Sequence, residues 1–279
     1  MRTRNLLTAG ILLAVCCSNS FAQDADSKIV FEEDLVYGRV HGAGLLADVA
    51  YPKATDKPLA AIISVHGGRW RGGRKADNST IKVQQWADFG FFAMSIDYRL
   101  VGCTPAPACY QDLQCAIRFV HAHAEKYNID PDHIFLIGQS AGGHMVSLAA
   151  TLGDGKFRRT GGHEKARNDF RAVISVAANY ELTTLSWGNI WTPANGDAIE
   201  ARKYASPVNH VRKDMKPLLI IHADNDRSVP IDNALMMVDA LKKAGSPHKF
   251  LRYEDAGHMG ITNEVIKQSL EFIKANSAK

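Results

Sequence analysis

Short hydrophobic runs alternate with amphipathic segments along most of this chain. Residues 60–65, Ala-Ala-Ile-Ile-Ser-Val, form a continuous apolar run, which is typical of a strand buried on both faces of a sheet. Residues 29–31, 35–37 and 45–51 are predicted as strands of an antiparallel edge. The same pattern predicts further strands at 91–96, 133–137, 172–176, 217–221 and 249–253.

Helical periodicity fills the stretches between these strands. Apolar residues recur on one face between Leu113 and Ala124, and this spacing predicts a long amphipathic helix. Because strands and helices alternate with short connections, we predict an α/β protein with a mostly parallel, eight-stranded sheet covered on both faces. Ligands bind such sheets beyond the carboxyl ends of the strands. Other helices are predicted at about 79–89, from 145 onward, at 231–244 and at 261–275, with a loop at 152–170.

The N-terminus has the pattern of a secretory signal. Arg2 and Arg4 precede an apolar run at 6–17, and Ser20-Phe21-Ala22 places small residues where a signal peptidase reads. The run is shorter than the roughly 20 residues that span a bilayer. We therefore expect cleavage after Ala22, a secreted or periplasmic protein, and no stable membrane association of the mature chain. A lipoprotein site at Cys16 fits less well, because a valine precedes it.

The net charge and the cysteines add little to the predicted fold and location. Loss of residues 1–22 removes two arginines and no acid, so the net charge falls from +4 to +2, too little to indicate a nucleic-acid partner. In an oxidising compartment Cys103 and Cys109 either close a small loop, worth about 2 kcal/mol, or stay as thiols. Cys115 lies within a predicted helix and is expected to be a buried free thiol.

A serine lies at the junction of a predicted strand and a predicted helix. Residues 138–142 read Gly-Gln-Ser-Ala-Gly, which fits the G-x-S-x-G nucleophile elbow of α/β-hydrolases. The pattern is short, so the flanking strand and helix supply the context that supports it. The turn is so sharp that side chains two residues from the serine would collide with their neighbours. We therefore predict Ser140 as a nucleophile in a strained backbone conformation.

Partners for this serine are found in the expected chain order of serine, acid and histidine. His258 lies between the last predicted strand and the last predicted helix, flanked by small residues, and is the candidate base. Asp226 and Asp224 both follow the strand at 217–221. Asp226 is favoured as the acid, because it lies deeper in the loop, and Asp224 is the alternative. His144, one helical turn after the serine, is expected to be structural.

An oxyanion hole needs backbone N–H donors, each worth about 3 kcal/mol. Ala141, directly after the nucleophile, is one candidate, and Gly67 and Gly68 in the loop after the first buried strand are the others. Four side chains near these donors or in the irregular segment 182–204 are candidates for substrate binding or, equally, for solvent exposure and packing: Arg69, Trp70, Trp187 and Trp191. The chemistry needs no metal and no cofactor.

Several motifs together carry a family resemblance: His66-Gly67-Gly68-x-Trp70, Asp97-Tyr98-Arg99-Leu100, the 138–142 elbow, Ser206-Pro207, His222-x-x-x-Asp226-x-x-Val229-Pro230 and Gly257-His258. The chain resembles bacterial esterases of the hormone-sensitive-lipase-like branch, above all the group related to bifunctional acetylxylan and feruloyl esterases. This implies an α/β-hydrolase domain at 23–279, a small cap at 182–204, the triad Ser140, Asp226 and His258, and structural roles for Asp97, Arg99 and Asp112. Arg69 replaces the third glycine that is usual in that family. Related arylformamidases also carry a larger residue at this position, so the oxyanion loop alone does not separate ester from formamide substrates.

The resemblance implies a serine carboxylesterase that acts through an acyl-enzyme on short acyl or aromatic acyl esters, such as acetyl or feruloyl groups on plant polysaccharide. Its partner is then a small-molecule or polysaccharide-linked ester, and the oligomeric state is left open. An exported peptidase of the prolyl-oligopeptidase type is disfavoured without a propeller-sized N-terminal domain. An arylformamidase fits poorly with a signal peptide. A non-catalytic hydrolase-fold binding protein would usually lack a triad member.

Overall fold

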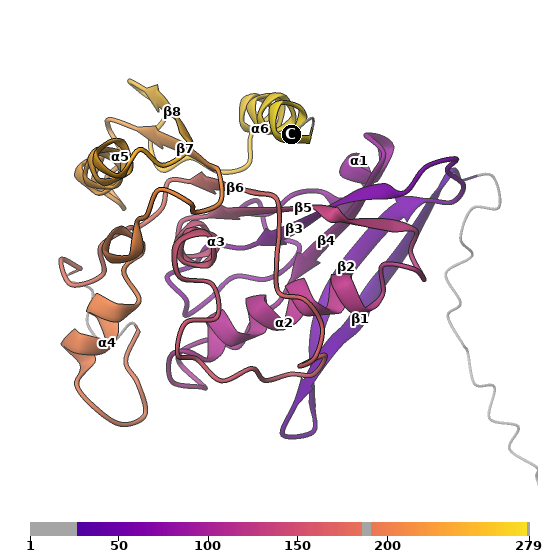
Figure 1. The fold of residues 1–279 in the computed structure, drawn as a ribbon, viewed down its shortest axis with the longest axis horizontal. Coiled ribbons are helices and arrows are strands. Elements are labelled where there is room, and N and C mark those ends of the chain that lie inside the picture. The colour runs from indigo at the N-terminus through magenta and orange to yellow at the C-terminus, as the bar shows by residue number, and fades with distance from the viewer. Residues whose placement is uncertain (1–26, 186–190, 278–279) are drawn as a thin grey trace, which may run out of the picture.

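An eight-stranded sheet forms the centre of the computed structural model, which describes residues 27–185 and 191–277 (Figure 1). The order across the sheet is β1-β2-β4-β3-β5-β6-β7-β8. β2 pairs antiparallel with β1 on one side and with β4 on the other, and every other neighbouring pair is parallel. The strands are β1 (Ile29–Val40), β2 (Ala43–Pro52), β3 (Leu59–Val65), β4 (Phe91–Ile96), β5 (Ile129–Gln139), β6 (Ala172–Val176), β7 (Leu218–Ala223) and β8 (His248–Tyr253).

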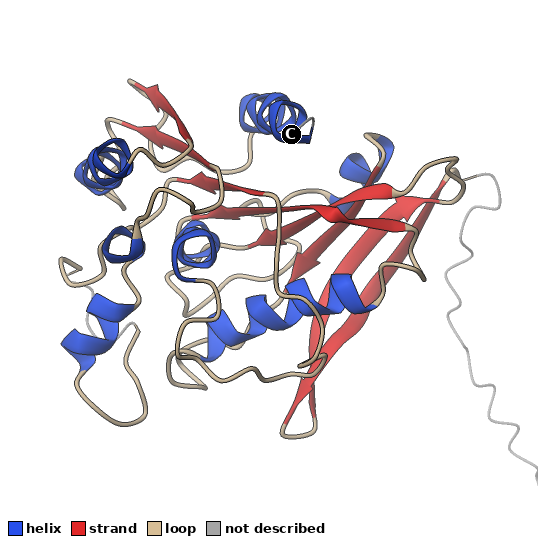
Figure 2. Ribbon diagram, viewed as in Figure 1, coloured by secondary structure: helices blue, strands red, loops and turns tan. Residues whose placement is uncertain are grey.

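Helices cover both faces of this sheet (Figure 2). One face carries α2 (Ala108–Ala122), α3 (Ala141–Leu152) and α5 (Asp232–Ala244), whose apolar residues share one core cluster with the sheet. The other face carries α1 (Val83–Asp88) and α6 (Asn263–Ser277), which pack in a second cluster. A short helix, α4 (Ala198–Tyr204), and the 3₁₀ helix η1 (Pro207–His210) lie beside the first face. The predicted α/β fold is confirmed.

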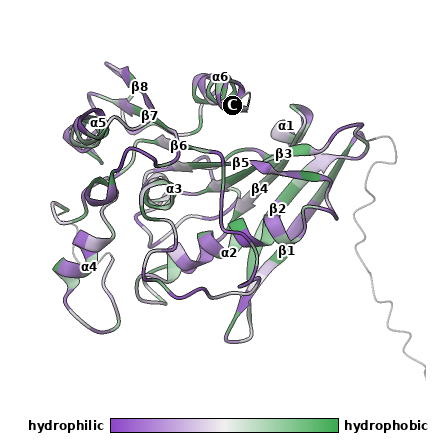
Figure 3. Cartoon of the chain, viewed as in Figure 1, coloured by the Kyte–Doolittle hydropathy of each residue, from purple (hydrophilic) through white to green (hydrophobic). Residues whose placement is uncertain are grey.

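The central strands are buried because both of their faces meet helices. Every residue of β4, β6 and β7 is buried, which explains why their sequences read as continuous apolar runs instead of alternating patterns. Figure 3 shows hydrophobic residues concentrated along these strands, whereas α4 is largely hydrophilic. The core therefore sits on both sides of the sheet and leaves the strand ends free to carry chemistry.

Some boundaries differ from those predicted. Residues 29–31 and 35–37 belong to one long strand, β1, whose pairing with β2 shifts register between Glu32 and Leu35. A bulge of this kind breaks the hydrophobic alternation, so the sequence reads as two strands. The helix predicted at 79–89 is only α1, because turns and bends continue to residue 80 and the helix begins at Val83. The predicted cap contains α4, and residues 186–190 lie outside the described residues, as does the predicted signal peptide.

The register of the parallel strands brings their carboxyl ends to one edge. Val65 at the end of β3 pairs with Ile96 of β4 and with Gly138 of β5. Gln139 pairs in turn with Val176 at the end of β6. The loops that follow β3, β5 and β7 therefore emerge side by side.

The three described cysteines are free thiols, so the structure does not contain the Cys103–Cys109 bond. Cys103 is exposed and Cys109 is fully buried at the start of α2. Cys115 is buried as predicted, against the backbones of Gly38 and Gly161, where a Cβ on either glycine would strike its sulfur. None of the described helices is long and apolar enough to cross a bilayer.

Candidate active site

Ser140 occupies the sharp turn between β5 and α3. Its backbone has φ 52° and ψ −115°, which lies in a region that residues with a Cβ rarely adopt. Its amide donates to the carbonyl oxygen of Val176 at 2.8 Å, so β6 holds the turn in place. The predicted strained conformation is thus present, and it lies at the carboxyl edge of the sheet.

The glycines of the elbow are required by close backbone approach. A Cβ on Gly138 would collide with the carbonyl group of Gly142. A Cβ on Gly142 would collide with the carbonyl oxygen of Val65, the last residue of β3. Neither contact involves a flexible side chain, so neither can be relieved by a change of rotamer. The G-x-S-x-G pattern therefore packs α3 directly against the ends of β5 and β3.

His258 and Asp226 are brought together from separate loops. The Nδ1 of His258 donates to Oδ2 of Asp226 at 2.8 Å. The other carboxylate oxygen of Asp226 accepts the amides of Ser228 and Val229, at 2.8 and 2.9 Å. Because its Nδ1 faces the acid, His258 keeps Nε2 free for proton transfer, and its side chain is 28% exposed.

The electrostatics of this pair suit an acid that stays ionised. Burial alone would raise the pKa of the Asp226 carboxyl, but hydrogen bonds from His258 and from the Val229 and Ser228 amides outweigh it and hold the pKa below its usual value. Asp226 therefore remains a carboxylate that can stabilise a protonated imidazole.

Asp224, the alternative acid, faces another way. Its carboxylate pairs with Arg252 of β8 at 2.5 Å and is partly exposed. His222 lies closer to the triad, but its Nε2 donates to the carbonyl oxygen of Val229 at 2.9 Å and lies 3.5 Å from Asp226. Burial lowers the pKa of His222. The geometry therefore favours Asp226 over Asp224, and it gives His222 a bracing role in the acid loop.

The structure of the oxyanion loop contradicts the prediction that the Gly67 amide is an oxyanion donor. The amide of Gly67 donates to Oγ of Ser79 at 3.1 Å and is buried, so it is not available as an oxyanion donor in this conformation. Gly68 is exposed with φ 105°, and no described residue accepts its amide hydrogen. Ala141 is the first residue of α3, where amides lack an intrahelical acceptor. Gly68 and Ala141 are the donors that this geometry supports.

His66 and Tyr98 brace this loop from behind. The two rings stack with centroids 4.0 Å apart, and Nδ1 of His66 donates to the Gly67 carbonyl oxygen at 2.6 Å. The Tyr98 hydroxyl lies 3.2 Å from the carbonyl oxygens of both His66 and Gly67. Burial lowers the pKa of His66, which keeps this imidazole neutral. Gly67 therefore serves as an anchor that holds the neighbouring Gly68 in position.

Gln139 links three parts of the site, a role that the sequence did not indicate. Its Nε2 donates to the carbonyl oxygen of Met259, the residue after His258, at 2.9 Å. Its side-chain oxygen lies so close to Gly67 that a Cβ there would collide with it. Gln139 occupies the variable position before Ser140 in the G-x-S-x-G pattern. A long amide side chain at such a tight turn is the one sequence signal from which this linking role could have been predicted.

The predicted substrate-binding side chains have different environments. Trp70 and Trp191 are 0% and 1% exposed, so of the two roles left open for them the structure supports packing and not substrate binding. Their rings pack edge-on to each other and to the buried His144, whose Nε2 donates to the Ala205 carbonyl oxygen. Burial lowers the pKa of His144 to about 4, in line with its expected structural role. Arg69 is exposed, and Trp187 lies outside the described residues.

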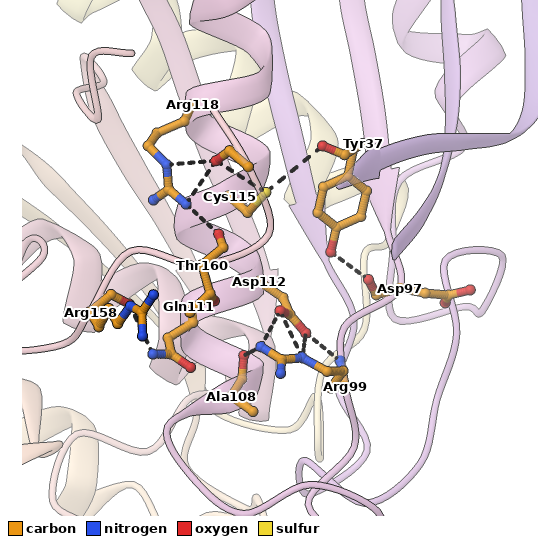
Figure 4. A network of polar contacts seen from close by, with 11 residues as sticks. Tyr37, Asp97, Arg99, Ala108, Gln111, Asp112, Cys115, Arg118, Arg158 and Thr160 are labelled. Atoms are coloured by element: carbon orange, nitrogen blue, oxygen red, sulfur yellow. Dashed lines mark hydrogen bonds and ion pairs between the residues drawn. The ribbon is translucent and has the colours of Figure 1, made fainter. Parts of the chain in front are cut away.

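A polar network behind the site anchors the chain after β4 (Figure 4). Asp112, fully buried on α2, accepts from Nε and Nη2 of Arg99 at 2.7 to 3.0 Å and from the Arg99 amide at 2.8 Å. Asp97 accepts the Lys75 amide through its carboxylate and the Tyr37 hydroxyl through its carbonyl. These contacts give Asp97, Arg99 and Asp112 the structural roles that the motif resemblance implies.

The assembled groups can perform acyl transfer. They provide a hydroxyl at a sharp turn, an imidazole oriented by a carboxylate, and two backbone N–H groups from the loop after β3 and the start of α3. Among residues 27–185 and 191–277, no group of three or more histidine, cysteine or acidic side chains is arranged to hold a metal ion.

Comparison with known proteins supports this reading of the fold. The BD-FAE family model matches residues 47–241. A truncated carbohydrate esterase from gut microbiota has a TM-score of 0.78 and 25% identity, covering 90% of this chain and 97% of its own. Esterase 2 of Thermogutta terrifontis, phosphonylated by cyclosarin, has a TM-score of 0.71 and 26% identity, covering 86% and 90% of the two chains.

Curated relatives are longer than this chain. The probable carboxylic ester hydrolase LipM of Mycobacterium tuberculosis is 30% identical over 195 residues, which cover 65% of this chain and 44% of LipM. The chain spans about half the length of the curated relatives it matches. The matches nevertheless confirm the resemblance to α/β-hydrolase esterases that the sequence motifs indicate.

Proposed function

This chain belongs to the BD-FAE family, and on that premise we propose that it is a serine carboxylic-ester hydrolase with the triad Ser140, Asp226 and His258. The observation that carries the proposal is the His258–Asp226 hydrogen bond of 2.8 Å, in a loop whose Met259 carbonyl is bound by Gln139, the residue before the strained Ser140. Ser140 attacks the acyl carbonyl carbon while Nε2 of His258 takes its proton. Asp226 stabilises the imidazolium that forms.

The oxyanion of the tetrahedral intermediate accepts hydrogen bonds from the amides of Gly68 and Ala141. The protonated His258 then donates to the leaving oxygen, the bond between the acyl carbon and that oxygen breaks, and the alcohol departs while the acyl group stays on Ser140 as the acyl-enzyme. A water molecule, deprotonated by His258, attacks the acyl carbon and frees the acid. Every proton in this sequence passes through His258, which explains why its ring is held by Asp226 and its loop by Gln139.

We propose short acyl or aromatic acyl esters on polysaccharide as the substrate class, with acetyl and feruloyl groups as the candidates. The support is the likeness to a carbohydrate esterase from gut microbiota and to a probable carboxylic ester hydrolase. We also propose that the protein is exported, since the first 22 residues have the pattern of a signal peptide.

Active-site labelling and steady-state kinetics test this proposal together. In Ser140→Ala, kcat on p-nitrophenyl acetate should fall by a factor on the order of 10⁶. An organophosphonate should form one adduct on the wild type, mapped by mass spectrometry to Ser140. An unchanged rate in the alanine variant, or an adduct elsewhere, would contradict the assignment.

A substrate panel separates the ester hydrolase from its rivals. Acetylated xylan, methyl ferulate, N-formylkynurenine and a proline-containing amide represent the proposed reaction and the arylformamidase and peptidase alternatives. Hydrolysis of the esters at a higher kcat/KM than the amides supports the proposal. Turnover of only the formamide or only the peptide would replace it, and no turnover with an intact triad would indicate a binding protein.

A further inference from the structure

A cavity lined by none of the catalytic groups lies between α4 and the residues that precede α2. Its volume is about 530 Å³, within the range of small-molecule sites. The described residues that line it come from the two positions before α2, the loop after α3, the segment before α4, α4 itself and η1. None of them belongs to the triad or to the oxyanion loop.

Aromatic rings form one wall of this cavity. Phe157 and Tyr204 are both partly exposed there, and their rings meet edge to face with centroids 5.3 Å apart. Trp191 lies behind them, and Pro107 and Pro193 extend the apolar surface. Rings placed in this way offer flat carbon surface to a ligand without closing around it.

Charged groups at the cavity are already matched with partners. Lys156 Nζ lies 4.0 Å from the centre of the Tyr204 ring, and Lys203 Nζ lies 4.0 Å from Glu200. Asp197 accepts the two amides that begin α4, at 2.7 and 3.0 Å. Two lysines and two acids leave no net charge. The cavity is therefore matched to a neutral ligand and not to a free carboxylate or a phosphate.

Hydrogen bonds that involve backbone groups connect the segments that line this cavity. The Ala106 amide donates to the Thr192 carbonyl oxygen at 3.0 Å, and Ala106 forms an isolated parallel bridge with Pro193. The Lys156 amide donates to the Tyr204 hydroxyl oxygen at 2.8 Å. The cavity is thus held from three segments, as a preformed ligand site would be.

Trp191 connects the cavity to the catalytic layer. Its ring lies 5.1 Å from His144, one turn after the nucleophile, and 6.3 Å from Trp70, two residues after Gly68. A ligand in the cavity therefore lies one aromatic side chain away from the groups that support the elbow and the oxyanion loop.

From these features we propose that the cavity is a non-catalytic subsite for a neutral sugar residue of a polysaccharide. A pyranose ring presents a face of C–H groups that can stack on Phe157, and an edge of hydroxyls that can meet the side chains of Asn195 and Asn209. This inference rests on the proposed function in one respect, because that function makes a polysaccharide the substrate class. Binding at the subsite itself needs no ester and no working triad.

Binding is measured with ester-free oligosaccharides. Xylohexaose and cellohexaose are titrated by calorimetry into Ser140→Ala, with ferulate as an aromatic, charged comparison. Ala201→Trp places a ring in the cavity from α4, and Phe157→Ala removes one wall. Ile199→Trp is the matched control, since Ile199 lies on the same helix, is 54% exposed and does not line the cavity.

We expect at least one hexasaccharide to bind, with Kd raised about tenfold or more by Ala201→Trp and by Phe157→Ala but unchanged by Ile199→Trp. All three variants should keep wild-type kcat on p-nitrophenyl acetate when Ser140 is intact, which also shows that they fold. Absence of hexasaccharide binding at millimolar concentrations, binding of ferulate alone, or binding that survives both cavity variants would overturn the inference. Hydrolysis of p-nitrophenyl acetate reports separately on the proposed function, so one can fail while the other stands.

Discussion

Gln139 offers a direct test of how the catalytic loops are held. It is 6% exposed, and its Nε2 donates to the carbonyl oxygen of Met259, which is also buried. Gln139→Met keeps the length of the side chain but removes the donor. The Met259 carbonyl is then left without this partner, and an unpaired buried acceptor costs about 1–3 kcal/mol.

The effect on kcat depends on how much of this free energy is lost in the transition state for hydrolysis. Met259 follows His258 directly, so relaxation of its carbonyl toward water would move the imidazole away from Ser140. If the whole cost falls on the transition state, kcat decreases about five- to 150-fold, since each 1.36 kcal/mol is a factor of ten. KM for a small ester should change little, because Gln139 does not reach the exposed surface.

The assay is steady-state hydrolysis of p-nitrophenyl acetate together with thermal unfolding. Gln114→Met is the matched control, because Gln114 is 4% exposed on α2 and its side-chain oxygen accepts from Asn168, away from the triad. Both variants should unfold at a lower temperature, but only Gln139→Met should lose kcat. If both keep kcat while both lose stability, Gln139 is a packing residue and the reasoning about the His258 loop is refuted.

Three further predictions follow from the site. Asp226→Asn should lower kcat by about 10⁴-fold, whereas Asp224→Asn should change it less than tenfold; the reverse order in steady-state kinetics would exchange their roles. The Asp226 pKa is held below its usual 3.8, so its stabilising contribution is complete above that pH and is lost as the pH falls through the folded value. Acid denaturation of Asp226→Asn should accordingly be shallower than that of the wild type, and parallel curves would count against this linkage. Asn179 is fully buried with neither side-chain polar atom paired. Asn179→Leu should stabilise the fold by about 1–3 kcal/mol, and a lower melting temperature in calorimetry would show that the amide has a partner.

Local constraints account for the parts of the molecule that could be predicted from the sequence. The elbow depends on Gly138 and Gly142 within five residues of Ser140, and the apolar runs report burial on both faces of a sheet. Asp226 was distinguishable from Asp224 because it lies two residues further from the end of β7. A carboxylate deeper in that loop can reach the separate loop that carries His258. Each of these signals is contained in a short stretch of chain.

Features that depend on distant segments could not be predicted. The amide of Gly67 is bound by Ser79, twelve residues later in a turn without periodicity, so the motif alone cannot show that Gly68 is the exposed donor. Trp191 is buried because Trp70 and His144 arrive from two other parts of the chain. In an irregular segment, the sequence pattern around a tryptophan is the same whether its ring packs in the core or contacts a ligand.

Burial explains how one histidine near the site can act as a base while its neighbours cannot. His66, His144 and His222 each donate one hydrogen bond to a backbone carbonyl, and burial lowers the pKa of each. A base must accept a proton and carry a positive charge, which desolvation opposes at these three rings. His258 has different surroundings, because its side chain is 28% exposed and its Nδ1 donates to the ionised Asp226 instead of a backbone carbonyl. The same fold therefore uses neutral imidazoles as fixed braces, whereas the ring that must become charged donates to a carboxylate at 2.8 Å.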